Sequence, residues 1–233
     1  MMTEIIKLDT EKNNQRTMDI DVLSTEKILQ KINDEDQLVA SIVAKNIPQI
    51  APLVNQIVDR MQQGGRLFYI GAGTSGRLGV LDAAECPPTY GVDPGLVIGL
   101  IAGGEKAMFI AQEGAEDSLD LAKKDLTDYR LGDKDTVIGL AASGRTPYVI
   151  GGLQFAREIG ALTGAISCVQ GAEISKFAQY PIEAVTGAEA IMGSTRMKAG
   201  TAQKLILNMI STSVMIKLGK VYKNYMVDLK PSN

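Results

Sequence analysis

The chain has 233 residues and contains no histidine. Histidine is the side chain whose unperturbed pKa lies in the physiological range, so its absence excludes a Ser-His-Asp triad, a Cys-His pair and a His-ligated zinc site. Lysine and arginine number 24 and aspartate and glutamate 27, which gives a formal charge of −3. This mild negative charge argues against nucleic acid as the main partner, because phosphate backbones attract clustered lysine and arginine.

Composition also indicates the class of protein and its compartment. Hydrophobic residues make up 45% of the chain and charged residues 22%, as is typical of a globular protein with a full core. Cys86 and Cys168 lie far apart, which suits a reducing cytoplasm better than a disulfide framework. We expect no signal peptide, no membrane contact and no metal, because no apolar run approaches ~18 residues and no acidic cluster has the spacing of a calcium or magnesium loop.

The first part of the chain is expected to be an arm followed by helices. Residues 1–22 are polar and irregular, and we interpret them as an arm rather than a core element. Over residues 24–63 apolar side chains recur at three- and four-residue steps, which predicts helices. Pro48 is placed to open the last of these helices. We therefore predict that residues 1–63 pack as an N-terminal arm and helices on a second unit, residues 64–233.

Beyond residue 64 the pattern changes to short apolar runs separated by amphipathic stretches. The runs cover residues 67–70, 96–101, 136–140, 163–169 and 182–185. Strands of this kind alternating with helices predict an α/β fold, with a doubly wound, five-stranded parallel sheet of flavodoxin-like order. Among the helices, one is expected over 147–159 with Thr146 as its N-cap, and a final long one over about 198–218.

Two loops that follow strands carry the same tripeptide, Ser-Gly-Arg. It occurs within GAGTSGR at residues 71–77 and within AASGRT at residues 141–146. In a sheet of order 2-1-3-4-5, the first and third strands are neighbours at the switch point where ligands bind. Hydroxyls, backbone N–H groups and a helix N-terminus suit a phosphate, so the pair of loops predicts a small phosphate monoester such as a sugar phosphate. The alternative is two ordinary strand–helix turns capped by Ser and Thr.

A nucleotide cofactor fits these loops less well, and no cofactor is predicted. The first loop has the form G-x-G-x-x-G, which in a dinucleotide site is accompanied by an acidic residue at the tip of the second strand. Here the nearest acidic residue, Glu105, lies two glycines beyond that strand. No G-x-x-x-x-G-K-[ST] motif occurs, which disfavours nucleotide kinase chemistry. A third polar cluster, GSTRMK at residues 193–198, either completes the site or is a capped helix start with solvated basic residues.

Without histidine, carboxylates are the candidates for acid–base chemistry. Glu85 lies among small and apolar residues after the first loop, where desolvation would raise its pKa toward that of a general acid. The alternative for Glu85 is a carboxylate satisfied by backbone donors near a helix end. Three glutamates follow the second strand beside the same crevice, and the residues alone do not choose among Glu105, Glu113 and Glu116. Cys86 is interpreted as a small core thiol rather than a nucleophile.

Several long segments match one family. They cover residues 17–21, 71–77, 81–91, 101–105, 113–117, 141–150, 193–207 and 224–228. In these segments the chain resembles the N-acetylmuramic acid 6-phosphate etherases, which belong to the sugar isomerase (SIS) superfamily. The resemblance implies a doubly wound fold that binds phosphosugars and a homodimer. Because such proteins usually continue into a small helical C-terminal domain, the chain is expected to be a short version or a truncation.

The resemblance also implies a reaction and its residues. The family cleaves the D-lactyl ether of N-acetylmuramate 6-phosphate to N-acetylglucosamine 6-phosphate and D-lactate, without a metal or cofactor. It places the catalytic acid on Glu85 and a second catalytic glutamate on Glu116. Our hypothesis for their roles is that Glu85 protonates the departing lactate and later deprotonates water, while Glu116 handles the C2 proton. The residues expected to bind the phosphate or lie close to it are Thr74, Ser75, Ser143, Arg145, Thr146 and Ser194.

Two rival functions use a similar fold. The glucokinase regulatory protein is similar to these etherases and binds sugar phosphates to control a partner without catalysis. Aldose–ketose isomerases on this fold shuttle a proton between C1 and C2 instead of expelling a substituent from C3. The presence of both Glu85 and Glu116 in matching motifs favours the etherase.

Overall fold

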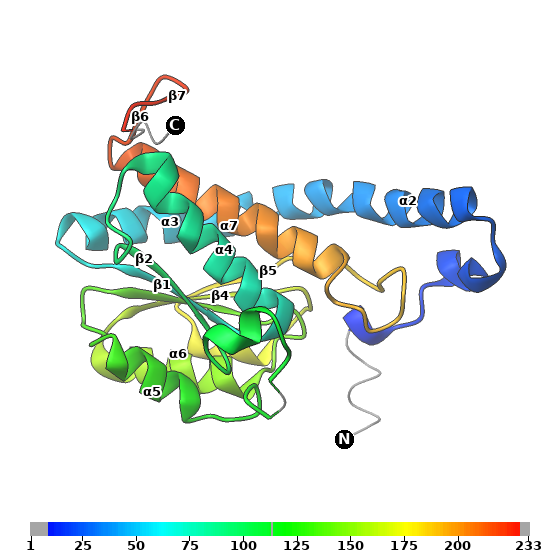
Figure 1. The fold of residues 1–233 in the computed structure, drawn as a ribbon, viewed down its shortest axis with the longest axis horizontal. Coiled ribbons are helices and arrows are strands. Elements are labelled where there is room, and N and C mark those ends of the chain that lie inside the picture. The colour runs from blue at the N-terminus through cyan, green and yellow to red at the C-terminus, as the bar shows by residue number, and fades with distance from the viewer. Residues whose placement is uncertain (1–8, 113, 229–233) are drawn as a thin grey trace.

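A parallel β-sheet between two layers of helices organises the computed structural model, which describes residues 9–112 and 114–228 (Figure 1). Its strands are β1 (Leu67–Gly71), β2 (Val97–Ile101), β3 (Thr136–Leu140), β4 (Leu162–Ser167) and β5 (Tyr180–Glu183). They lie in the order β2-β1-β3-β4-β5, and each neighbouring pair is parallel. This confirms the predicted doubly wound sheet with flavodoxin-like order.

Helices cover both faces of the sheet. They are α2 (Thr25–Ala44), α3 (Ile47–Gln62), α4 (Gly73–Tyr90), α5 (Leu121–Asp128), α6 (Pro147–Ile159) and α7 (Lys198–Lys217). Apolar side chains of α3, α4 and α7 share one core cluster with the sheet, and those of α5 and α6 share the other. Figure 1 shows the two layers above and below the strands.

Strand β1 shows why the sheet strands are continuous apolar runs. Leu67 and Tyr69 point into the core cluster with α3, α4 and α7, while Phe68 and Ile70 point into the cluster with α5 and α6. All four side chains are fully buried. Because side chains alternate between faces and both faces are covered by helices, every position of the strand must be apolar.

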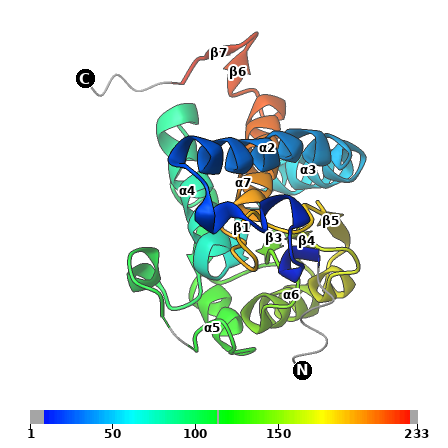
Figure 2. The same ribbon diagram turned by 90° about the vertical axis from the view of Figure 1, so that its right-hand side faces the viewer.

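The predicted helices are found close to their expected bounds. Helix α6 covers the predicted range 147–159, and α7 ends one residue before residue 218. The helical region 24–63 is divided at Lys45–Asn46, and Pro48 lies in the first turn of α3 as expected. The N-terminal half of α2 extends beyond the sheet layer (Figures 1 and 2), and the buried residues of this helix begin at Glu35.

The last predicted strand is displaced toward the N-terminus. The expected range was 182–185, whereas β5 begins at Tyr180 and ends at Glu183. Strand β5 lies at one edge of the sheet and combines the buried Ile182 with the exposed Pro181. Proline is tolerated in an edge strand, and its presence breaks the apolar run that marks the other four strands.

Short elements that the sequence analysis did not predict complete the described fold. They are the 3-10 turns η1 (Asp9–Glu11), η2 (Gln15–Thr17), η3 (Ile20–Val22), η4 (Glu105–Met108) and η5 (Glu173–Phe177), and the antiparallel strands β6 (Val221–Tyr222) and β7 (Tyr225–Met226). None of the helices within residues 9–112 and 114–228 combines the length and apolar character needed to cross a membrane.

The N-terminal segment is irregular, as expected, but it is docked rather than free. Thr10, Asn14 and Thr17 are all buried. The Thr17 hydroxyl donates to the backbone carbonyl of Ala190 at 2.8 Å, and the Asn14 amide donates to that of Ala188 at 3.4 Å. The particular contacts were not predicted, because bonds from polar side chains to backbone carbonyls leave no hydrophobic pattern in the sequence.

Candidate active site

A cavity of about 290 Å³ opens where the chain leaves β1 and β3. These strands are neighbours with their connections on opposite sides, which is the switch point of a doubly wound sheet. The cavity is lined by residues 72–75, Glu116, residues 141–143, Arg145, Thr146, Thr195 and Glu11. The structure thus brings together six predicted site residues, which are Thr74, Ser75, Ser143, Arg145, Thr146 and Glu116.

Two helix N-termini make one wall of this cavity suitable for an anion. Helix α4 begins at Gly73, and α6 begins directly after Thr146. Each helix N-terminus carries roughly half a positive charge, and the Arg145 side chain adds a full one. Thr146 occupies the N-cap position without a side-chain capping bond, so its hydroxyl is not used by the helix. This arrangement has the chemistry of a phosphate site.

The two Ser-Gly-Arg loops have different roles for their arginines. Arg145 lines the 290 Å³ cavity. Arg77 instead donates from Nη2 to the carbonyl of Ala107 at 2.7 Å and from Nε to that of Met108 at 2.9 Å. Its guanidinium therefore fixes η4 and lines an adjacent cavity of about 170 Å³. The repeated tripeptide correctly indicated two loops at one crevice. It did not indicate that only Arg145 of the two arginines lines the 290 Å³ cavity.

The floor of the cavity includes a contact that sequence reasoning missed. The Ser75 hydroxyl donates to Oε1 of Gln203 on α7 at 2.8 Å, and both residues are buried. Gln203 Nε2 is also buried and has no hydrogen-bond partner among the residues that the structure describes. The only sequence signal for Gln203 is a polar residue on the inward face of a helix.

Of the glutamates after β2, Glu116 lies in the cavity. Its side chain is exposed toward that space, and its backbone carbonyl accepts a hydrogen bond from the Tyr148 N–H at 3.0 Å. That bond ties the Glu116 loop to the first turn of α6. Glu105 is exposed on η4 and lines a different hollow. Glu113 lies outside the described residues.

Glu85 does not lie in this cavity. It projects from α4 into a separate hollow of about 190 Å³, with Lys204 of α7 on the other side. Ten residues separate Ser75 from Glu85, and a helix rises 1.5 Å per residue, so the two are about 15 Å apart along α4. The side chain is exposed, so the expected desolvation of Glu85 is absent in the single chain.

Its neighbour Cys86 is a core thiol, as interpreted from the sequence. The side chain is buried, and Sγ donates to the backbone carbonyl of Asp82 at 3.4 Å. Burial raises the pKa of the Cys86 thiol to about 12, which removes the thiolate needed for a nucleophile. No group of three or more Cys, Asp or Glu side chains within residues 9–112 and 114–228 is placed to hold a metal ion.

The segment before α7 contributes Thr195 to the cavity, whereas Ser194 is not part of the lining. Buried Glu189 holds this segment, because its carboxylate accepts hydrogen bonds from the N–H groups of Lys198 and Ala199, both at 2.9 Å. Lys198, expected to be either a site residue or solvated, is buried, and its ammonium contacts Glu35 of α2 at 2.6 Å.

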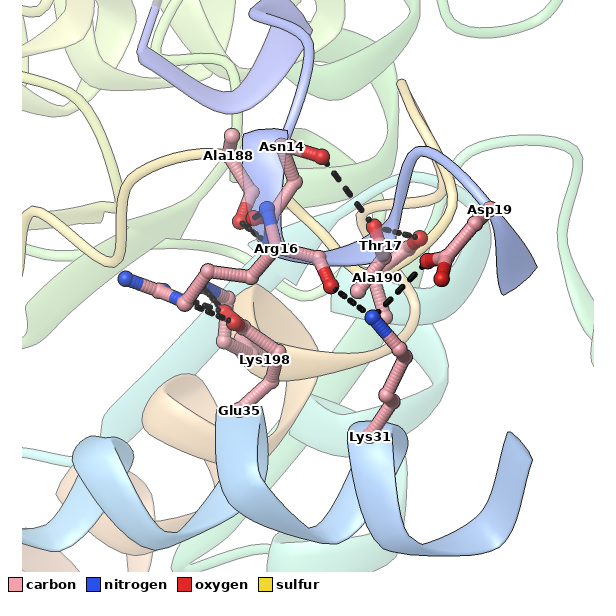
Figure 3. A network of polar contacts seen from close by, with 9 residues as sticks. All are labelled: Asn14, Arg16, Thr17, Asp19, Lys31, Glu35, Ala188, Ala190 and Lys198. Atoms are coloured by element: carbon pink, nitrogen blue, oxygen red, sulfur yellow. Dashed lines mark hydrogen bonds and ion pairs between the residues drawn. The ribbon is translucent and has the colours of Figure 1, made fainter. Parts of the chain in front are cut away.

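A charge network centred on the buried Glu35 joins this segment to the N-terminal turns (Figure 3). Arg16 donates from Nε at 2.5 Å and from Nη2 at 2.9 Å to the Glu35 carboxylate, which also binds Lys198. Burial alone would raise the pKa of Glu35, but the hydrogen bonds from Arg16 and Lys198 outweigh it and lower this pKa to about 2. Glu35 is therefore ionised in the folded protein at neutral pH.

The fold and the cavity together define the class of protein. Residues 49–157 match the family described as the glucokinase regulatory protein N-terminal SIS domain. Two similar solved structures are a putative phosphosugar isomerase from Bacteroides fragilis and a phosphoheptose isomerase from Francisella tularensis. The first has a TM-score of 0.65 and 16% identity over 87% of this chain and 95% of that one. The second has a TM-score of 0.60 and 12% identity over 83% and 100%. At these identities the likeness shows an SIS-type fold.

Closer relatives identify the family. The N-acetylmuramic acid 6-phosphate etherase of Clostridium botulinum is 65% identical over 98% of this chain and 76% of its own length. The enzyme of the same name from Halalkalibacterium halodurans is 61% identical over 97% of this chain and 76% of its length. The chain belongs to the N-acetylmuramic acid 6-phosphate etherase family, a family of carbon–oxygen lyases. It spans about three quarters of the length of these relatives.

Proposed function

We propose that the protein cleaves the D-lactyl ether of N-acetylmuramate 6-phosphate and releases N-acetylglucosamine 6-phosphate and D-lactate. The observation that carries this proposal is the cavity at the switch point, which combines an anion-binding wall, formed by the N-termini of α4 and α6 and by Arg145, with the carboxylate of Glu116. The identity of 65% to an etherase of this name supports the same reaction. Free, buried Cys86 and Cys168 support a cytoplasmic setting.

We propose that the phosphate lies at the N-termini of α4 and α6. There, the hydroxyls of Ser75, Ser143 and Thr146 would donate to its oxygens, and Arg145 would balance its charge. A phosphate monoester carries about −1.5 to −2 charges at neutral pH, which the positive charge of this wall complements. The sugar then extends toward Glu116, which lines the same cavity.

The reaction proceeds by elimination and addition. Opening of the sugar ring gives an aldehyde, which makes the C2 proton acidic, and Glu116 removes this proton. The C3–O bond then breaks, its electron pair goes to the lactate oxygen, and Glu85 protonates that oxygen. Glu85 next takes a proton from water, whose oxygen adds to C3 of the conjugated alkene, and Glu116 returns a proton to C2. Both carboxylates end in their starting states, and one water is consumed.

Glu85 reaches this chemistry only from a second copy of the chain. The 290 Å³ cavity of the same chain lies about 15 Å away along α4. The Glu85 side chain is exposed beside Leu81, which is 50% exposed. A carboxylate exposed on the surface of one subunit is free to enter a site on another. We therefore propose a homodimer in which Glu85 of each subunit serves the cavity of the other.

The direct test is incubation with N-acetylmuramate 6-phosphate and measurement of D-lactate. Stoichiometric D-lactate and N-acetylglucosamine 6-phosphate are expected. The variant Ser143→Glu, which puts a carboxylate where the phosphate binds, should fold but release none. Isomerisation of the sugar without lactate, or binding without turnover, would replace the etherase with an isomerase or a sensor.

A further inference from the structure

We propose that Glu11 is a substrate-binding residue that accepts hydrogen bonds from the sugar's O–H and N–H donors. This inference rests on the proposed function, since it names the part of the substrate that the residue contacts. Glu11 lines the same cavity as Ser75, Ser143 and Glu116, although it comes from the N-terminal turns outside the doubly wound sheet. The cavity therefore has a second carboxylate from its own chain, at a position that the sequence pattern did not indicate.

The position of the Glu11 carboxylate is set by two neighbours. Oε1 accepts a hydrogen bond from the Thr10 hydroxyl at 3.3 Å. Oε2 lies against Gly193, where an added Cβ would come within 3.0 Å of it. Gly193 has a φ of +74°, a conformation that glycine adopts without strain. A side chain at residue 193 would press on the carboxylate and shift it slightly, so a glycine leaves this contact free of strain.

The turns that carry Glu11 are anchored to the segment that carries Thr195. Asn14 and Thr17 donate to the backbone carbonyls of Ala188 and Ala190, and Figure 3 shows these bonds beside the Arg16–Glu35 pair. Both cavity residues thus belong to one docked unit, whose polar bonds are buried or partly buried. A pre-positioned side chain loses little conformational freedom when a ligand binds, which favours a binding role.

Charge decides which part of the substrate Glu11 contacts. A carboxylate would repel the phosphate, which is placed at the helix N-termini beside Arg145, so Glu11 must contact the sugar. An ionised carboxylate only accepts hydrogen bonds, and its partners are therefore sugar hydroxyls or the acetamido N–H. It would also repel the carboxylate of the lactyl group. Glu11 therefore orients the sugar with its lactyl group directed away from the N-terminal turns.

The experiment measures binding and turnover of Glu11→Gln and Glu11→Ala beside the matched surface control Glu158→Gln, which lies exposed near the C-terminus of α6. We expect Glu11→Ala to raise the KM for N-acetylmuramate 6-phosphate and the Kd for N-acetylglucosamine 6-phosphate at least tenfold, with kcat within about threefold. Glu11→Gln keeps one acceptor oxygen and should show a smaller increase. The affinity for inorganic phosphate should not fall in either variant.

Two results would overturn the proposal. One is an unchanged Kd for N-acetylglucosamine 6-phosphate in Glu11→Ala. The other is an equal loss of affinity for inorganic phosphate, which would mean that the variant only loosens the cavity wall. The two proposals fail separately. A wild-type protein that releases no lactate would refute the etherase proposal. The role of Glu11 is still tested in that case, because the Kd is measured without turnover.

Discussion

The contact between Ser75 and Gln203 joins a site residue that the sequence marks to one that it does not mark. Its hydroxyl donates to Gln203 Oε1, while Gln203 Nε2 is buried without a partner among the described residues. We propose that the Ser75 hydroxyl turns to donate to the phosphate and that the Gln203 amide then rotates so that Nε2 donates to the Ser75 oxygen. In this role Gln203 is a positioning residue for the phosphate donor.

Replacing Gln203 tests this coupling. Gln203→Met keeps the side-chain length but removes both polar atoms, so the affinity for a 6-phosphosugar should fall about tenfold, near the ~1 kcal/mol of a typical hydrogen bond. Calorimetry should show that Ser75→Ala and Gln203→Met together lose less than the sum of their separate effects. Gln154→Met, on the exposed side of α6, is the control. Additive losses would contradict the positioning role.

The predicted and missed residues differ in the signal they leave in the sequence. Thr74, Ser75 and Ser143 were predicted because a repeated tripeptide followed two buried strands. Glu11 belongs to a charged, irregular segment, a pattern typical of solvated chain, and its position depends on distant contacts with residues 188–193. Such contacts are set by docking of loops, for which no periodic pattern exists.

At the scale of elements, the ion pair between α2 and the start of α7 stabilises the cavity wall. Glu35→Gln would leave the Lys198 ammonium buried without its counter-charge. Removing one partner of a buried pair costs about 3 kcal/mol, so the free energy of unfolding in urea at pH 7 should fall by this amount. The control Glu26→Gln, exposed in the first turn of α2, should lower it by less than ~1 kcal/mol, the size of a helix-dipole interaction.

The pH dependence gives the same variant a second readout. The folded-state pKa of Glu35 is about 2 against an ordinary value of 4.5. Its stabilising contribution is therefore complete above pH 4.5 and is lost as the pH falls toward 2. The stability difference between the wild type and Glu35→Gln should shrink over this range. A constant difference would show that ionisation of Glu35 does not stabilise the fold.

The elements themselves were largely predictable, and their docking was not. Strands buried on both faces produce apolar runs, which is why β1 and β3 were found with accurate bounds. Helix α2 carries a glutamate at a buried position, and Lys198 begins α7 inside the protein. Charged residues are expected at the surface, so no pattern in the sequence pairs Glu35 with Lys198 across 163 positions.

At the scale of the whole molecule, the separation of Glu85 from the cavity is the basis of the proposed homodimer. Mixing separately inactive Glu85→Gln and Ser143→Glu subunits under exchange should restore activity. Random pairing makes about half of the dimers mixed. In each mixed dimer, one of the two cavities has native Ser143 and is served by native Glu85. About a quarter of wild-type activity is therefore expected for a twofold dimer. A mixture that stays inactive despite subunit exchange would mean that Glu85 does not act across an interface.

The central claim is that the ether is broken at C3 by elimination and that water then adds to C3. The most direct measurement is turnover of N-acetylmuramate 6-phosphate in ¹⁸O-labelled water, followed by mass spectrometry of both products. Elimination followed by water addition predicts one ¹⁸O at C3 of N-acetylglucosamine 6-phosphate, in addition to any label that exchanges into the aldehyde. It predicts no ¹⁸O at the hydroxyl of D-lactate. Label in the lactate hydroxyl with none at C3 would contradict it.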